Sequence, residues 1–227
     1  MKRPVLALTA LLVLVFPGVL PRAEGSDREG HGARVVPRLS TAIPSAHVMV
    51  FSTEEGAFDR GVSNQGWWSA TYAAWDDNDN YLTGIDLVGN LVRDFFTFDL
   101  SRLDRQAVKA FLVVQRYDTA GDPFEVLSLW DVATPAAVLN DNDGTSDLIY
   151  ADLGSGRTYG SFAIQTGFPE NSLVRLELNA AALADINAAR GGYFSIGGRL
   201  NTAEGAGEYV FGFSDGEGPQ YLIVLLS

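Results

Sequence analysis

Two short segments of the chain concentrate the side chains that bind hard metal ions. The first is Asp76-Asp77-Asn78-Asp79-Asn80, and the second is Asn140-Asp141-Asn142-Asp143. Calcium prefers clusters of carboxylate and amide oxygens. We therefore expect calcium, the one cofactor that this sequence suggests, to bind at these segments. The expected ligands are Asp76, Asp77, Asp79, Asp141 and Asp143.

Neither segment fits the loop of an EF-hand. Counted from Asp76, the sixth position is Tyr81 where glycine is needed, and the twelfth is Leu87 where glutamate is needed. Asp and Asn are also common in turns, and Asp143-Gly144 is a frequent turn pair between strands. The alternative is that both segments are solvated loops and that the protein requires no cofactor.

Aromatic residues offer a second kind of site, because flat apolar rings stack on sugars. Trp68 and Tyr72 share one parity along a predicted strand, whereas Trp67 and Trp75 have the opposite parity. We expect Trp67 and Trp75 to be exposed and, with Tyr81, to bind an extracellular polysaccharide. The alternative is that these rings pack in the core, where each buries a large apolar area.

The residues needed for most hydrolytic mechanisms are missing. The chain has no cysteine, and its histidines, His31 and His47, lie in or beside a polar N-terminal segment. A Ser-His-Asp triad, a multi-histidine metal site and a thiol nucleophile are therefore not expected. A glycoside hydrolase needs only two carboxylates, but no spacing selects a pair. The sequence predicts a non-catalytic protein, with a glycoside hydrolase as the enzymatic alternative.

The charge balance excludes one class of partner. The chain of 227 residues has 16 Lys and Arg against 28 Asp and Glu, a formal charge of −12. A polyanion would meet net repulsion instead of the counterion release that drives nucleic-acid binding. We expect an extracellular polysaccharide or a surface protein as the partner, and no nucleic acid.

The N-terminal residues predict export. Lys2 and Arg3 precede an apolar run from Val5 to Phe16, and small residues follow around Ala23. This is the three-part pattern of a secretory signal. The run is shorter than the roughly 20 residues of a membrane-spanning helix. We expect cleavage after residue 23, no membrane anchor afterwards, and a periplasmic or extracellular location.

The rest of the chain divides into two parts. Residues 24–46 are polar and rich in glycine, which predicts a flexible leader. From residue 47 to 227, short apolar runs recur about every eight to twelve residues between turn signals. The predicted fold class is all-β, a jelly-roll-like antiparallel β-sandwich with one short helix.

Several runs carry specific expectations. Val174–Leu178 alternates apolar and charged residues, as in a strand with one buried face. Strands are also expected over Trp68–Trp75, Leu148–Leu153 and, as the last strand, Gln220–Leu226. The helix is expected over Asn179–Arg190, because Asn179 is a good N-cap and Gly191 a good C-terminal residue.

Several short motifs carry a resemblance to a known group. They include Leu129-Trp130-Asp131-Val132, Arg93-Asp94-Phe95-Phe96 and Val210-Phe211-Gly212-Phe213. Residues 48–227 resemble secreted bacterial β-sandwich proteins that often carry a C-terminal sorting tail of the exosortase type. The Pro-Glu-Pro segment and basic end of that tail are missing here. The resemblance implies the fold and no activity, so three functions stay open: a carbohydrate-binding module, a structural surface or matrix protein, and a hydrolase.

Overall fold

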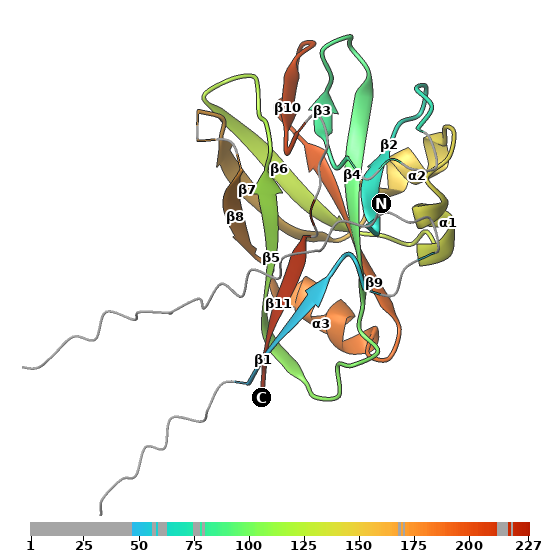
Figure 1. The fold of residues 1–227 in the computed structure, drawn as a ribbon, viewed down its shortest axis with the longest axis vertical. Helices are drawn as coiled ribbons and strands as arrows, with labels where there is room; N and C mark the ends of the chain where they lie inside the picture. Colours follow the sequence, from blue (N-terminus) through green and yellow to red (C-terminus); the bar gives the residue numbers. More distant parts are fainter. Residues whose placement is uncertain are drawn as a thin grey trace, which may run out of the picture. The chain divides into compact units, whose positions relative to one another are not determined.

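The computed structural model describes residues 47–55, 58, 63–74, 78, 80–167, 169, 171–212, 218 and 220–227. The predicted signal and leader segments therefore lie outside the described residues. The described part is an antiparallel β-sandwich with short helices (Figure 1). The predicted all-β fold class is confirmed.

The smaller sheet has four strands in the order β1-β11-β5-β8. Its outer strands are β1 (His47–Ser52) and β8 (Ser172–Glu177), and its central strands are β11 (Tyr221–Leu226) and β5 (Ala107–Arg116). Every pairing is antiparallel. The predicted last strand is thus confirmed, and it lies in the middle of this sheet.

The larger sheet has seven strands. Its order is β10-β3-β4-β9-β6-β7, and β2 also pairs with β4. The strands are β2 (Gln65–Trp68), β3 (Thr83–Ile85), β4 (Leu91–Asp99), β6 (Phe124–Asp131), β7 (Thr158–Gln165), β9 (Tyr193–Leu200) and β10 (Glu208–Val210). β2 and β3 therefore share one side of β4, with Trp67 opposite Asp94 and Gly84 opposite Val92.

The main hydrophobic core draws on both sheets. β11 contributes Leu222, Val224 and Leu226, and β4 contributes Phe96 and Phe98. Because side chains alternate along a strand, every second residue of β11 faces the core and the others face outward. The chain moves repeatedly between the two sheets, and this crossing gives the sandwich its jelly-roll-like character.

The predicted helix is confirmed as α3 (Ala180–Ala188). Asn179 caps it, because its side-chain oxygen accepts hydrogen bonds from the backbone N–H groups of Ala181 and Ala182 at 2.9 and 3.2 Å. Gly191, with φ of 80°, follows its end. Ile186 is fully buried and Leu183 packs against the same core.

Two further helices were not expected. They are α1 (Ala136–Asp141) and α2 (Asp147–Asp152), which lie beside β2 and β4 in Figure 1. The strand expected over Leu148–Leu153 is therefore wrong. Ser146 begins a helix instead, since its hydroxyl accepts a hydrogen bond from the backbone N–H of Ile149 at 3.2 Å.

The strand expected over Trp68–Trp75 is also wrong in its extent, because β2 ends at Trp68. The hydroxyl of Ser69 accepts hydrogen bonds from the backbone N–H groups of Thr71 and Tyr72, both at 3.3 Å. These local bonds turn the chain away from the sheet.

Candidate functional site

Described residues in and beside the two acidic segments contact each other. Ala74 and Gly144 exchange backbone hydrogen bonds of 2.9 and 3.1 Å. The side-chain Nδ2 of Asn142 donates to the backbone carbonyl of Asn78 at 2.9 Å. Two segments that the sequence separates by about sixty residues thus form one junction beside β2.

Asn142 contributes a buried side-chain oxygen to this junction. It caps the C-terminal end of α1 in a left-handed conformation, with φ of 42°. Its side chain is fully buried, and its Oδ1 has no hydrogen-bond partner among the described residues. A buried acceptor without a partner is costly, so such atoms often mark a bound ion or an ordered water.

The predicted metal ligands are placed only in part. Asp141 and Asp143 are exposed on either side of Asn142 in the chain. Asp76, Asp77 and Asp79, together with Trp75, lie outside the described residues. Within the described part of the chain, no three His, Cys, Asp or Glu side chains are grouped so as to hold a metal ion.

Two of the three predicted sugar-binding rings, Trp67 and Tyr81, are buried. Trp67 is 5% exposed and packs with Leu82, Val92 and Tyr209, so the expectation that it is exposed is wrong. Alternation along the strand predicted one buried and one exposed face, but both faces of β2 are covered by other parts of the protein. On the opposite face, Trp68 is also buried and donates its indole N–H to the carbonyl of Leu139 in α1 at 3.0 Å.

Tyr81 is also unavailable for stacking, since only 1% of it is exposed. Its ring packs against Phe96 and Phe211 in the main core. Its hydroxyl donates a hydrogen bond to the carbonyl of Gln115 at 3.0 Å. Tyr81 is therefore a core residue with a satisfied polar end.

The outward face of the four-stranded sheet is rich in apolar side chains, which the sequence analysis did not foresee. We call this surface the outer apolar face. On β1, Val48 and Val50 are about half exposed, and on β8 Leu173 is 68% exposed. The full set is Val48, Val50, Val108, Phe111, Val113, Leu173, Tyr221, Ile223 and Leu225.

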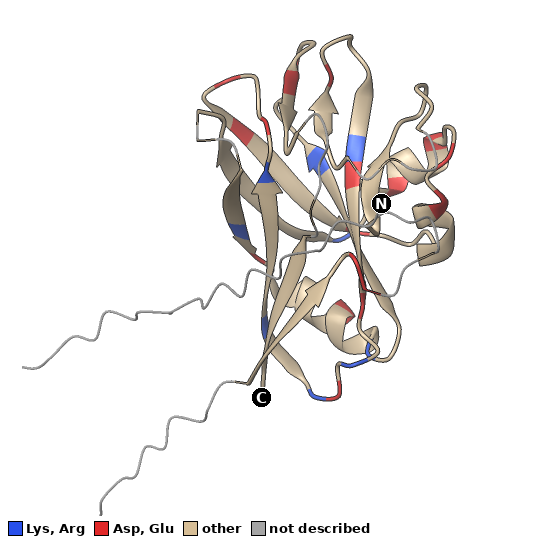
Figure 2. Cartoon of the chain, viewed as in Figure 1, with Lys and Arg blue, Asp and Glu red and all other residues tan. Residues whose placement is uncertain are grey.

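Among the strands of the outer apolar face, only β5 and β8 carry charged side chains. Neither β1 nor β11 contains Asp, Glu, Lys or Arg (Figure 2). On β5 and β8, the Lys109 Nζ lies 3.0 Å from the Glu177 Oε1. The guanidinium of Arg175 lies 4.8 Å from the centre of the Phe111 ring, and Lys109 lies 5.1 Å from it. Phe111 is thus held between two cations.

The edge of the sheet at β1 is partly covered. The guanidinium of Arg102 donates to the carbonyl of Val50 at 3.2 Å and to Glu55 at 2.5 Å. It also lies 5.3 Å from the ring centre of Phe51. A charged side chain on an edge strand disfavours pairing with a strand of another molecule.

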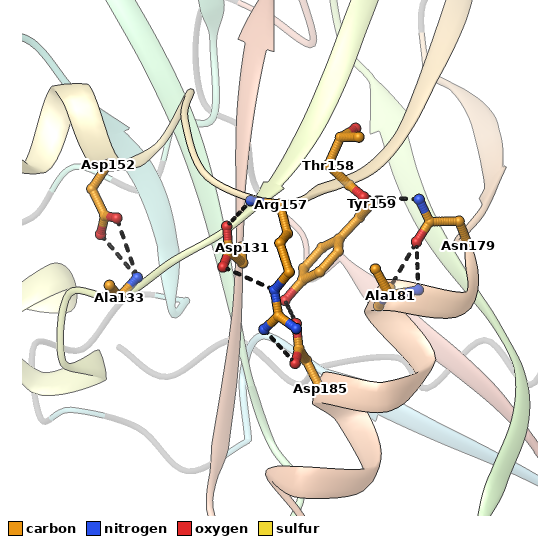
Figure 3. A network of polar contacts seen from close by, with 10 residues as sticks. Asp131, Ala133, Asp152, Arg157, Thr158, Tyr159, Asn179, Ala181 and Asp185 are labelled. Atoms are coloured by element: carbon orange, nitrogen blue, oxygen red, sulfur yellow. Dashed lines mark hydrogen bonds and ion pairs between the residues drawn. The ribbon is translucent and has the colours of Figure 1, made fainter.

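A polar network joins β6, β7 and α3 (Figure 3). The hydroxyl of Tyr159 donates to Asp185 at 2.8 Å, and Arg157 donates to the other oxygen of Asp185 at 2.7 Å. Arg157 also donates its backbone N–H to Asp131 at 2.6 Å. Burial, then the Asp185 carboxylate, raises the pKa of Tyr159.

This network is suited to holding the helix and not to acid–base chemistry. Both carboxylates are already bound to Arg157, and the charge of Asp185 raises the pKa of that guanidinium. Sequence reasoning missed the network, because its members are separated along the chain and have no characteristic spacing.

Asp94 is the most unusual carboxylate that the structure describes. It is fully buried, and neither of its side-chain oxygens has a hydrogen-bond partner among the described residues. In the register it lies between Trp67 on β2 and Gly198 on β9. Burial raises the pKa of this carboxyl well above the usual range, because the charged form loses its hydration.

A scan against protein-family models and a search of curated proteins found no match for this chain. No activity is therefore transferred to it from a relative. Among the described residues, no helix is long and apolar enough to cross a membrane.

Proposed function

We propose that the protein is exported and non-catalytic, and that it binds another component of an extracellular surface or matrix through the outer apolar face. The observation that carries this proposal is the apolar surface that extends over all four strands of the smaller sheet. The predicted signal segment and the resemblance to secreted β-sandwich proteins support export.

The composition of the face supports binding. An exposed apolar surface is unfavourable in water by about 25 cal/mol per Å². Contiguous apolar patches on soluble proteins therefore mark interaction sites. The centre of this face, on β11, is uncharged, while Lys109, Arg175 and Glu177 lie toward β8. An uncharged centre with polar residues beside it is typical of a protein interface.

The geometry favours a protein partner over a polysaccharide. Trp67 and Tyr81, two of the three rings on which sugar binding was expected, are buried. On the outer apolar face, Arg175 and Lys109 already lie against the ring of Phe111. A surface or matrix protein is therefore the proposed partner, and sugar binding is an outcome that the experiment tests.

The experiment measures retention of the purified protein on extracellular surface material, beside a pull-down with polysaccharides. We expect retention of the wild type and at least a tenfold loss for Ile223→Lys, which places a charge at the centre of the face. Val88→Lys is the matched control, because Val88 is 81% exposed in the turn between β3 and β4. Equal retention of both variants, or retention on polysaccharide alone, would contradict the proposal.

A second proposal is that calcium stabilises the junction of the acidic segments. The specific support is the buried Oδ1 of Asn142, which has no partner among the described residues. Asp141 and Asp143, next to it in the chain, supply carboxylates of the kind that calcium prefers. In this proposal calcium has a structural role and takes part in no reaction.

A further inference from the structure

Two oppositely charged residues share the exposed side of β8. Arg175 and Glu177 are both exposed, while Leu176 between them is buried in the core. The register places Arg175 opposite Val113, and Glu177 opposite Phe111, on β5. Arg175 and Glu177 are therefore the β8 members of two neighbouring rows of outward-facing side chains. Each row runs across all four strands of the sheet.

The two rows can be followed strand by strand. One row crosses the sheet from β1 to β8 as Val50, Ile223, Phe111 and Glu177. The next crosses it as Ser52, Tyr221, Val113 and Arg175. The inward-facing row between them contains Leu176 and Leu222, both buried.

The rows are complementary under twofold rotation. The twofold axis that would relate two copies lies in the plane of the face, perpendicular to the strands, and runs along the row that contains Leu176. Rotation about this axis exchanges the two rows, so a second copy would set its Tyr221 against Ile223. It would likewise set its Glu177 against Arg175, and its Arg175 against Glu177. In such an isologous interface each contact occurs twice.

Charge also favours this face, compared with the rest of the protein surface, as the place where a second copy binds. The whole chain has a formal charge of −12, so two copies repel over most approaches. The strands of the outer apolar face present two cations, Lys109 and Arg175, against one anion, Glu177. A second anion, Glu54, lies near this face, since burial and then the Glu54 carboxylate raise the pKa of Tyr221. The face is a surface on which two copies meet without an excess of like charge.

At one of the two sheet edges, β1, packing face to face is favoured over extension of the sheet. Arg102 covers part of β1 through its bond to the carbonyl of Val50. Extension of the sheet by a strand of a second copy would have to displace this guanidinium. Contact through the outward side chains requires no such displacement.

We propose that the outer apolar face is a homodimer interface, in which a twofold axis along the row of Leu176 pairs Arg175 of each copy with Glu177 of the other. This inference rests on the proposed function, because it names a second copy of this chain as the component that the face binds.

The first test measures the mass of the protein in solution by sedimentation velocity. We expect a dimer at micromolar concentrations, and a monomer for Ile223→Lys. Val88→Lys should remain dimeric, because its added charge lies outside the face. A thermal melt of each variant shows that it is folded. A wild type that stays monomeric at 100 micromolar, or a folded Ile223→Lys variant that stays dimeric, would overturn the proposal.

The second test uses charge exchange to locate the axis. Arg175→Glu and Glu177→Arg should each weaken the dimer at least tenfold, because each variant opposes like charges twice. An equal mixture of the two variants should form heterodimers close to wild-type affinity, since every pair is then opposite in charge. The double variant R175E/E177R should also recover. A mixture that stays monomeric would overturn this geometry.

The outcomes separate this inference from the proposed function. A monomeric wild type that is retained on surface material, and loses retention with Ile223→Lys, overturns the homodimer and leaves the proposed function standing. A dimer with the expected charge exchange, but without retention on surface material, supports the homodimer and contradicts the binding of any surface component other than a second copy.

Discussion

The side-chain amide of Asn142 donates a 2.9 Å hydrogen bond to the backbone carbonyl of Asn78, and this bond joins the two acidic segments of the chain. It uses only the nitrogen of the amide. The oxygen, Oδ1, is buried and has no partner among the described residues. The junction therefore contains a buried acceptor without a partner, and on this atom we base the proposal that calcium binds here.

Calcium is expected to raise the thermal midpoint of the protein. A ligand that binds only the folded state at ten times its Kd adds about 1.4 kcal/mol, or roughly 3–6 °C for a domain of this size. The double substitution Asp141→Asn and Asp143→Asn should abolish this shift. Asp104→Asn, at an exposed position elsewhere, should keep it. An unchanged midpoint of the wild type at millimolar calcium would contradict calcium binding.

Replacement of Asp94 by asparagine is expected to stabilise the protein at neutral pH. The pKa of Asp94 is raised in the folded state, whereas an unfolded aspartate has a pKa of about 3.9. Asp94 therefore contributes most to the free energy of unfolding at pH values below its pKa in the unfolded chain. This contribution is lost as the pH rises toward its pKa in the folded protein. The asparagine side chain of Asp94→Asn does not ionise, so the variant does not lose stability in this way as the pH rises.

Urea unfolding at pH 4 and pH 7 measures this effect. The free energy of unfolding of Asp94→Asn, relative to the wild type, should be higher at pH 7 than at pH 4. Titration of all other groups is common to both proteins and cancels in the comparison. Asp104→Asn serves as the exposed control. A difference between Asp94→Asn and wild type that does not change with pH would show that Asp94 is ionised in the folded protein.

Gly198→Ala is expected to destabilise the protein by about 1–3 kcal/mol. A Cβ at this position would collide with the carboxylate of Asp94. The control is Gly167→Ala, where the added carbon meets no atom within 4 Å. If the collision is the cause, Gly198→Ala should cost less in an Asp94→Ala background. Equal costs in both backgrounds, measured by urea unfolding, would contradict this contact.

Asn179→Ala is expected to lower the free energy of unfolding by about 1 kcal/mol, because it removes the N-cap of α3. The side chain also donates to the carbonyl of Thr158 at 2.8 Å, so the loss couples the helix to β7. Asn179→Asp keeps the capping oxygen and should recover part of the stability. An aspartate variant no better than alanine would show that the cap contributes little.

Two elements, β8 and α3, could be predicted from short stretches of sequence alone. The alternation of Val174–Leu178 identified β8, because one of its faces is buried and the other is exposed. The N-cap Asn179 and the terminal Gly191 identified α3 within two residues. In both segments the residues that decide the structure are neighbours in the sequence.

Other features depend on contacts that no local pattern records. Trp67 was expected to be exposed by its parity, but both faces of β2 are covered. Leu148–Leu153 is apolar enough for a strand, but Ser146 caps a helix here, and Ile149 and Leu153 pack against Trp68 and Phe95. On β11 both faces are apolar, so alternation does not reveal which residues face the core and which form the outer apolar face.

The twofold interface is tested most directly by sedimentation velocity on an equal mixture of the Arg175→Glu and Glu177→Arg variants, each also measured alone. We expect each variant alone to be largely monomeric and the mixture to sediment as a dimer. Variants that dimerise like the wild type, or a mixture that stays monomeric, would contradict an interface through the outer face of this sheet.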